Sequence, residues 1–313
     1  MSNQPLVTIA IPAYKSFFLK KAIASALGQT YQNIEVIVVD DKSPNGIADI
    51  VATFNDNRLA YYCNQHNVGA NDPSANWNQC LKYAKGDYIC ILCDDDMYAK
   101  TYVETMVQLA LKYPDCNVFR CGIEEVDAEG KTTDIYPLSP EYQDMVEYIW
   151  NRHSDNTRQT MSEWMIKRSA LDSIGGYVAC PIAWGSDCCT VFALGERTGV
   201  VSSSNRMMYF RNTDKNISGR DYAFIPQKVL GWEKQCDMAS EIVSRSLSPY
   251  KAIVLQEINT GRRRYTKYLI KHAGVKDLQL MIKSKDIYHL SFGWYIKGIY
   301  RNILWGLHLR KKK

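Results

Sequence analysis

The chain has 313 residues, of which 46% are apolar and 23% charged, and this composition excludes disordered and collagen-like proteins. Its length corresponds to two average domains, or to one large α/β domain with an appendage. The net charge of +5 is unevenly spread: residues 262–313 hold 14 Lys and Arg against two acids, a net of +12, and the rest carries −7. An acidic body with a basic tail indicates that the tail meets an anionic partner.

The first 120 residues alternate between short apolar runs and segments of helical periodicity. The apolar runs predict buried strands at Val7–Pro12, Ile34–Val39, Leu59–Cys63 and Tyr88–Cys93. The segments that follow them predict helices at Leu19–Leu27, Ile47–Phe54, Trp77–Ala84 and Thr101–Lys112. Strands that are apolar throughout and alternate with helices are typical of a mostly parallel sheet covered on both faces, so we expect an α/β fold.

After residue 120 the alternation fades into an α+β pattern. We expect a short strand at Ser162–Ile166 and a helix at Arg168–Ile174. Another helix is expected at Cys188–Gly195, with Ser186 or Asp187 at its N-cap. From residue 224 onward the pattern is mainly helical, which predicts a domain boundary near residue 225.

Three predicted strands end in residues that can bind a ligand. The first ends at Pro12–Tyr14, the second at Asp40–Asp41 and the fourth at Asp94–Asp96. The carboxyl ends of parallel strands meet at one edge of the sheet, where open α/β folds bind ligands. Neighbouring carboxylates raise one another's pKa, and Mg²⁺ or Mn²⁺ carrying diphosphate oxygens would relieve that repulsion. The alternative is a solvated acidic loop that caps the next helix.

Other nucleotide and ester chemistries lack their motifs in this chain. The first strand-to-helix turn, residues 12–20, contains no glycine, and there is no G-x-x-x-x-G-K-[ST] or G-x-S-x-G sequence. Phosphate is therefore expected to be held through a metal ion. Ten cysteines are present, with Cys90 and Cys93 as C-x-x-C, but no second pair follows at zinc-like spacing. We expect free thiols in a reducing cytoplasm, in a chain whose polar N-terminus does not suggest a signal peptide.

The motifs and their order resemble the family 2 glycosyltransferases. The opening of that family is matched by VTIAIPAY at 7–14, ASALGQTY at 24–31 and IEVIVVDDKS at 34–43. Its acidic metal-binding motif and distal region are matched by Asn67–Gly69, Gly86–Ile89, Leu92–Asp96, Ile174–Tyr177, Ser186–Asp187 and Gly199. The resemblance covers about residues 6–215. It implies a GT-A fold at 1–225, with a nucleotide-sugar half at 1–120 and an acceptor half at 121–225, followed by a helical basic extension at 226–313.

The resemblance implies a role for each matched position on the donor side. Pro12 and Tyr14 would line the pocket for the nucleotide base, and Asp41, or less directly Asp40, would bond the base. Asn67 would edge the donor site.

The acidic motif would hold the ribose and the metal through Asp94 and Asp95, with Asp96 following. Cys93 stands where the family commonly has an acid, so the pair of aspartates that binds the metal stays open.

On the acceptor side, the resemblance makes Asp187 the catalytic base. Asp187 matches the second acid of the family's Glu-Asp pair, and Ser186 replaces the first. As a carboxylate it would take the proton from an attacking acceptor hydroxyl, while the metal offsets charge on the leaving diphosphate. Trp184 either stacks on a sugar or belongs to the core. Arg211 and Ser218 resemble the end of the acceptor region.

Three function hypotheses follow. The first is an inverting transferase that uses a nucleotide-sugar donor, with UDP favoured, and a glycan or lipid-linked acceptor in cell-surface polysaccharide synthesis. The second is a non-catalytic nucleotide-sugar-binding module of an assembly complex. The third, a nucleic-acid binder using Arg262–Arg264, lacks a recognition motif and has an acidic body, so no nucleic-acid partner is expected.

The C-terminal segment Tyr288–Leu309 has an apolar and aromatic face bordered by Lys297 and Arg301. This is the composition of a helix that lies in a membrane interface, and the two charges argue against a span. We therefore expect a cytoplasmic enzyme that docks on the cytoplasmic face of the membrane through anionic lipid. The alternative is a helix packed on the protein's own core.

Overall fold

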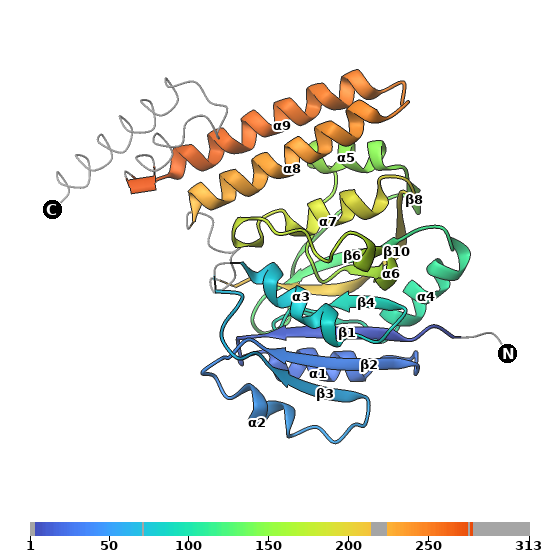
Figure 1. The fold of residues 1–313 in the computed structure, drawn as a ribbon, viewed down its shortest axis with the longest axis vertical. Helices are drawn as coiled ribbons and strands as arrows, with labels where there is room; N and C mark the ends of the chain where they lie inside the picture. The colour runs from blue at the N-terminus through green and yellow to red at the C-terminus, as the bar shows by residue number, and fades with distance from the viewer. Residues whose placement is uncertain (1–3, 71, 214–223, 275, 278–313) are drawn as a thin grey trace.

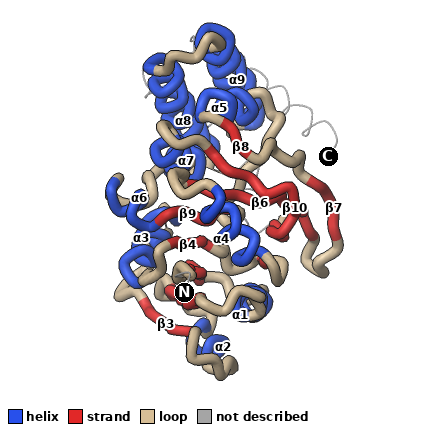
Figure 2. Tube along the Cα trace, turned by 90° about the vertical axis from the view of Figure 1, so that its right-hand side faces the viewer, coloured by secondary structure: helices blue, strands red, loops and turns tan. Residues whose placement is uncertain are grey.

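The computed structural model describes residues 4–70, 72–213, 224–274 and 276–277. Its centre is one sheet with the strand order β3-β2-β1-β4-β9-β6-β10-β5, to which β7 is added beside β6 and β8 beside β10 (Figures 1 and 2). The strands are β1 Val7–Ala13, β2 Ile34–Asp40, β3 Leu59–Cys63, β4 Tyr88–Ile91, β5 Met97–Tyr98, β6 Val118–Val126, β7 Thr132–Ile135, β8 Tyr142–Gln143, β9 Trp164–Lys167 and β10 Val200–Arg211. Strands β1 to β4 are parallel, as predicted, and β9 is inserted antiparallel between β4 and β6.

Helices cover both faces of the sheet, because successive strand residues point to opposite sides. They are α1 Leu19–Leu27, α2 Ile47–Val51, α3 Pro73–Tyr83, α4 Tyr102–Lys112, α5 Met145–His153, α6 Arg168–Ser173, α7 Ser186–Gly195, α8 Ile225–Arg245 and α9 Lys251–His272, with a short 3₁₀ turn η1 at Pro181–Ala183. One core joins the sheet to α1, α2 and α4, and contains Ile9. The other joins it to α3 and to α5 through α9, and contains Ala10.

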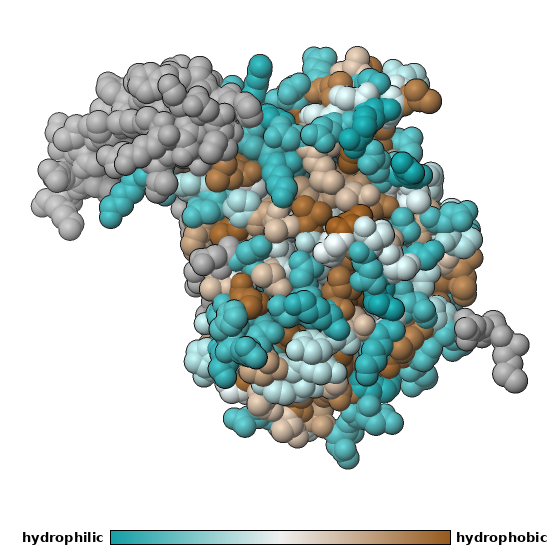
Figure 3. All heavy atoms as spheres, in the orientation of Figure 1, coloured by the Kyte–Doolittle hydropathy of each residue, from teal (hydrophilic) through white to brown (hydrophobic). Residues whose placement is uncertain are grey.

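Helices α8 and α9 lie side by side at one end of the molecule, opposite β3 and α2 (Figure 1). They share the apolar core of the sheet: Trp232, Ala239 and Ile258 belong to the same cluster as Ala10 and Trp164. On the face drawn in Figure 3, apolar residues occur in small groups separated by polar ones. Among the described helices, none has both the length and the apolar character that a membrane crossing requires. The segment Tyr288–Leu309 lies outside the described residues.

Several element boundaries differ from the predictions. Helix α3 begins at Pro73, because the Asp72 side chain accepts a hydrogen bond from the Ser74 N–H and proline fits the first turn. Helix α7 begins at Ser186 and its N-cap is Gly185, with φ 87° and no side-chain cap, so the prediction of Ser186 or Asp187 as the cap was wrong. All ten cysteines are free thiols, as expected.

Candidate functional site

A cavity of about 1360 Å³ opens at the carboxyl ends of β1, β2 and β4. On one side its wall includes Pro12, Tyr14, Asp41, Asn67 and the turn Asp94–Asp96. On the other side it includes Asp187 with residues of η1, α8 and α9. Most of the residues that the sequence assigned to a donor or to an acceptor thus line one cavity. Asp40 and Arg211 do not line it, and Ser218 lies outside the described residues.

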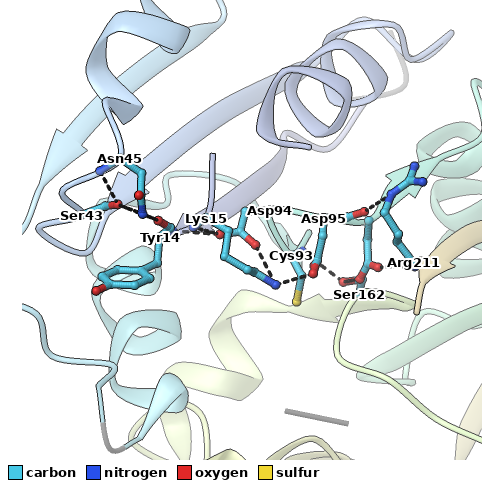
Figure 4. Close-up of polar contacts among 10 residues, drawn as sticks. Tyr14, Lys15, Ser43, Asn45, Cys93, Asp94, Asp95, Ser162 and Arg211 are labelled. Atoms are coloured by element: carbon cyan, nitrogen blue, oxygen red, sulfur yellow. Dashed lines mark hydrogen bonds and ion pairs between the residues drawn. The ribbon is translucent and has the colours of Figure 1, made fainter. Parts of the chain in front are cut away.

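Asp94 ties the acidic turn to the end of β1. Its Oδ2 accepts hydrogen bonds from the backbone N–H groups of Tyr14, at 2.8 Å, and Lys15, at 2.6 Å (Figure 4). Burial raises the pKa of Asp94, and the ammonium of Lys15, 3.3 Å from Oδ1, opposes that rise. The carboxylate therefore has one oxygen fixed by backbone and the other facing a cation.

Lys15 bridges Asp94 and Asp95. Its Nζ also donates to Asp95 Oδ2, and its side chain is about one-third exposed at the cavity wall. Burial alone would lower the pKa of Lys15, but the two carboxylates outweigh burial and raise it. An ammonium thus holds the position between the two acids that the sequence suggested for a metal ion.

Asp96 has both oxygens engaged by the protein. Ser162 Oγ donates to Oδ2 at 2.6 Å, and the backbone N–H of Arg211 donates to Oδ1 at 3.0 Å. Burial and the neighbouring Asp95 raise the pKa of Asp96 to about 8. The Arg211 guanidinium, at the end of β10, also donates to the carbonyl of Asp95 at 3.1 Å and anchors the turn from behind.

The pair after β2 organises the donor-side loop. Asp41 Oδ1 accepts from Asn64 Nδ2 and the Val68 N–H, both at 2.8 Å, and Oδ2 accepts from the Gly69 N–H at 2.7 Å. The Asn67 side-chain oxygen, in the cavity wall, is buried without a hydrogen-bond partner. That orphaned acceptor is suited to a ligand N–H or O–H, because an unpaired buried polar atom is costly.

Asp40 lies behind this wall. Ser43 N–H donates to its Oδ1 at 2.8 Å and Tyr61 O–H donates to Oδ2 at 2.7 Å. Asp40 is 5% exposed and is not among the residues that line the cavity, so its contacts support the loop.

Asp187 lies in the first turn of α7, at the cavity wall. Burial raises its pKa, and the Arg152 guanidinium opposes that rise. Helix N-termini also favour a carboxylate there. A carboxylate whose pKa is raised above its ordinary value is closer to the pKa that favours a general base.

Sequence reasoning missed three features of the site. Lys15 carried no signal, because nothing in its local pattern places it between two acids from another strand. Arg152, which faces Asp187, follows an apolar helix pattern and was not singled out. Tyr265 and Tyr268 of α9 follow the arginines of the nucleic-acid hypothesis and were not singled out as part of this cavity.

The donor set fits a divalent cation that is held partly by its substrate. In the described part of the chain, no three His, Cys, Asp or Glu side chains form a cage for a metal ion on their own. Mg²⁺ and Mn²⁺ are, however, commonly held by one or two carboxylates plus phosphate oxygens. Asp94 Oδ1 and Asp95 offer such a pair at the cavity wall, provided that Lys15 moves aside.

The fold is of the GT-A type, with a cavity at the carboxyl ends of its parallel strands, and comparison with known proteins gives the family. The Glycosyl transferase family 2 model matches residues 8–175, so the chain belongs to the family 2 glycosyltransferases and is an enzyme of that class. The structure of Staphylococcus aureus TarS 1–349 in complex with UDP-GlcNAc has the same fold, with a TM-score of 0.64 at 13% identity over 90% of this chain and 89% of that chain. The mannosyltransferase PcManGT from Pyrobaculum calidifontis, in complex with GDP-Man and Mn²⁺, has a TM-score of 0.57 at 15% identity over 96% of this chain and 88% of that chain.

Curated relatives match part of the chain. An uncharacterized glycosyltransferase of Rickettsia typhi is 34% identical over 139 residues, 44% of this chain and 42% of that protein. The Escherichia coli UDP-Glc:alpha-D-GlcNAc-diphosphoundecaprenol beta-1,3-glucosyltransferase WfgD is 34% identical over 108 residues, 34% of this chain and 42% of that protein. The chain thus spans less than half the length of these relatives.

Proposed function

We propose that this glycosyltransferase is an inverting enzyme that uses a nucleoside diphosphate sugar, with UDP favoured, and a hydroxyl of a glycan or lipid-linked acceptor in cell-surface polysaccharide synthesis. The observation that carries the proposal is that Asp94 and Asp95 line the same cavity as Asp187. Sugar transfer needs the leaving diphosphate and the attacking hydroxyl in one enclosure. The UDP-GlcNAc complex of TarS, the GDP-Man and Mn²⁺ complex of PcManGT and the lipid diphosphate acceptor in the name of WfgD support it.

The donor base would lie between Tyr14 and the loop that Asp41 organises. Pro12 and the 42% exposed Tyr14 line that part of the cavity. Asn67 would accept a hydrogen bond from the nucleotide, while Asp41 bonds the base with its remaining lone pairs. Asp40 would support this loop from outside the cavity, through its hydrogen bonds with Ser43 and Tyr61.

Mg²⁺ or Mn²⁺ would be held by Asp94 and Asp95 together with diphosphate oxygens, and when bound it supplies positive charge for the leaving group. Asp96 would hold the turn in shape, because both of its oxygens are already used by Ser162 and Arg211. This assignment narrows the three aspartates of the sequence motif to two metal ligands and one positioning residue.

Asp187 would act on the acceptor. Its carboxylate takes the hydroxyl proton as the acceptor oxygen bonds to the anomeric carbon from the face opposite the diphosphate, whose bond to that carbon breaks. A single displacement of this kind inverts the anomeric centre. Arg152 would keep Asp187 ionised through its positive charge.

A donor panel tests the proposal: UDP-, GDP- and dTDP-sugars are incubated with the protein and Mn²⁺, and release of the nucleoside diphosphate is measured. We expect release from one donor class, loss of release in excess chelator and in Asp95→Ala, and a fall of at least about a hundredfold in Asp187→Asn with donor affinity preserved. Full turnover in excess chelator would refute the requirement for a metal ion. Donor binding without any release would favour the non-catalytic binding module.

We also propose that the basic C-terminal segment holds the enzyme on the cytoplasmic face of the membrane. The support is its sequence charge of +12 over 262–313, at about 1 kcal/mol per basic residue near anionic lipid. Truncation after Ser284 should release the protein from anionic liposomes and leave donor hydrolysis intact. If the intact protein does not bind such liposomes at low salt, the proposed location on the membrane is wrong.

A further inference from the structure

The cavity is larger than one substrate needs. Its volume of about 1360 Å³ exceeds the ~300–1,000 Å³ of ordinary ligand pockets. Besides the donor-side residues, its wall includes Asp187 and residues of α8 and α9. This second region is therefore available to the other substrate.

Aromatic rings follow one another along that wall. The ring centroids of Trp184 and Tyr265 are 6.5 Å apart, with planes within 8° of parallel, and those of Tyr265 and Tyr268 are 6.2 Å apart at 23°. Trp184 precedes Asp187 by three residues, so the series begins beside the proposed base and continues along α9. All three rings line the cavity.

These rings are more exposed than the core aromatic beside them, although Tyr265 also packs against the core. Trp232, which touches Tyr265 at 4.9 Å between centroids, is 7% exposed and belongs to the apolar core. Tyr268, by contrast, is 41% exposed, and Trp184 and Tyr265 are half-buried. Partly exposed aromatic rings in a cavity wall are typical of ligand contacts, because the ring offers a large apolar area and a polar rim.

The backbone that presents Trp184 is held in a strained shape. Ile182 and Ala183 have φ values of 52° and 56°, in the left-handed region that a β-branched residue such as Ile rarely adopts. Gly231 of α8 lets the helix approach this segment, since a Cβ at that position would lie 2.1 Å from the Trp184 carbonyl oxygen. Strain of this kind persists where surrounding packing enforces it, and it fixes Trp184 relative to Asp187.

The charges on the same wall decide what kind of ligand fits. Arg264 and Asp155 form an ion pair at 3.0 Å, with side chains 51% and 75% exposed, and both line the cavity. A hydrocarbon chain laid across them would remove water from both charges without replacing its hydrogen bonds. A sugar suits both the aromatic rings and the charges. A C–H face of the pyranose packs on an aromatic ring, and the sugar hydroxyls form hydrogen bonds with the charged groups.

We propose that Trp184, Tyr265 and Tyr268 form a subsite for a pyranose ring of the acceptor, and that α9 thereby selects which glycan is extended. The role of this subsite in sugar transfer rests on the proposed function. Its existence requires only that a sugar without a nucleotide binds at α9.

Saturation-transfer difference NMR with methyl glycosides of glucose, galactose, mannose and N-acetylglucosamine tests this directly. We expect transfer to the ring C–H protons of at least one glycoside with the full chain, a loss of more than about half of it in Tyr268→Ala, and retention in Tyr268→Phe. Tyr250→Ala is the matched control, because Tyr250 is a 64% exposed tyrosine at the other end of α9, outside this cavity. UDP affinity, measured in each variant, reports that the fold and the donor half are intact.

Two results would overturn the subsite: no transfer to any of the four glycosides, or equal transfer in the full chain and in Tyr268→Ala with UDP affinity preserved. Binding of an alkyl chain, tested with octanol in place of the glycosides, and no binding of the sugars would assign the wall to lipid and also overturn it. Failure of the proposed function is a separate result, since it appears as absent donor turnover in a protein that still binds the glycoside through Tyr268.

Discussion

Replacing Lys15 by methionine should increase the affinity of the protein for Mn²⁺. The Lys15 ammonium contacts Asp95 and lies 3.3 Å from Asp94 Oδ1, so a metal ion that uses these oxygens must displace it. Exposed ion pairs contribute about 0–1 kcal/mol, and breaking a buried one costs about 3–5 kcal/mol. With Lys15 one-third exposed and both acids buried, we place the displacement cost between them, near 1.5 kcal/mol, or about tenfold in affinity.

The assay is a Mn²⁺ titration followed by the electron paramagnetic resonance signal of the free ion, with UDP present. Methionine keeps the apolar stem of Lys15 and removes its charge, and Lys20→Met is the matched control because Lys20 is an exposed lysine of the neighbouring α1. Without metal, Lys15→Met should also unfold a few degrees lower, at roughly 2–4 °C per kcal/mol, because two buried acids lose their counter-charge. Unchanged or weaker Mn²⁺ binding in Lys15→Met would refute the reasoning.

Three further outcomes are expected. Arg152→Gln should move the acid limb of the pH–rate profile to higher pH, since loss of the positive charge raises the pKa of Asp187. If the limb does not move, Arg152 does not control the pKa of the catalytic base. His153 is 1% exposed, and burial and the Arg152 charge lower its pKa to about 3. Its contribution to the free energy of unfolding is therefore complete above pH 6.5, and is lost by about 1.4 kcal/mol per pH unit as the pH falls toward 3. Urea unfolding at pH 7 and 5 should show a smaller loss in His153→Phe than in the natural chain. Gly69→Ala should weaken UDP binding by about tenfold in calorimetry, because its Cβ would lie 2.8 Å from Asp41 Oδ2; normal affinity would place the nucleotide elsewhere.

The parallel half of the fold could be predicted because its signals are local. Strands β1 to β4 are continuous apolar runs, and α1 begins and ends at the predicted residues. The meeting of Tyr14, Asp41 and Asp94–Asp96 at one cavity followed from strand direction alone. These inferences needed no contact between distant residues beyond the rule that parallel strands end at a common edge.

The other half depended on contacts that no local pattern reports. Strand β10, Val200–Arg211, contains several serines and pairs with β6 through two register shifts, so its apolar alternation is broken. Its last residue nevertheless anchors the acidic turn through Arg211. The partners of Lys15 were hidden for the same reason, since they come from a sequence separation of about 80 residues. The predicted metal ligands, catalytic base and domain boundary stay predictions.

The shared core of the sheet and the C-terminal helices limits how this enzyme can be recombined. The family match ends at residue 175, yet Trp232, Ala239 and Ile258 pack in one apolar cluster with Ala10 of the first strand. A chimera joined at residue 175 would therefore bring foreign helices against this chain's sheet, and mismatched volumes there would leave voids or clashes. Exchange of acceptor preference between relatives should succeed more readily by grafting only cavity-facing positions of α9, such as Tyr268, onto an unchanged helix.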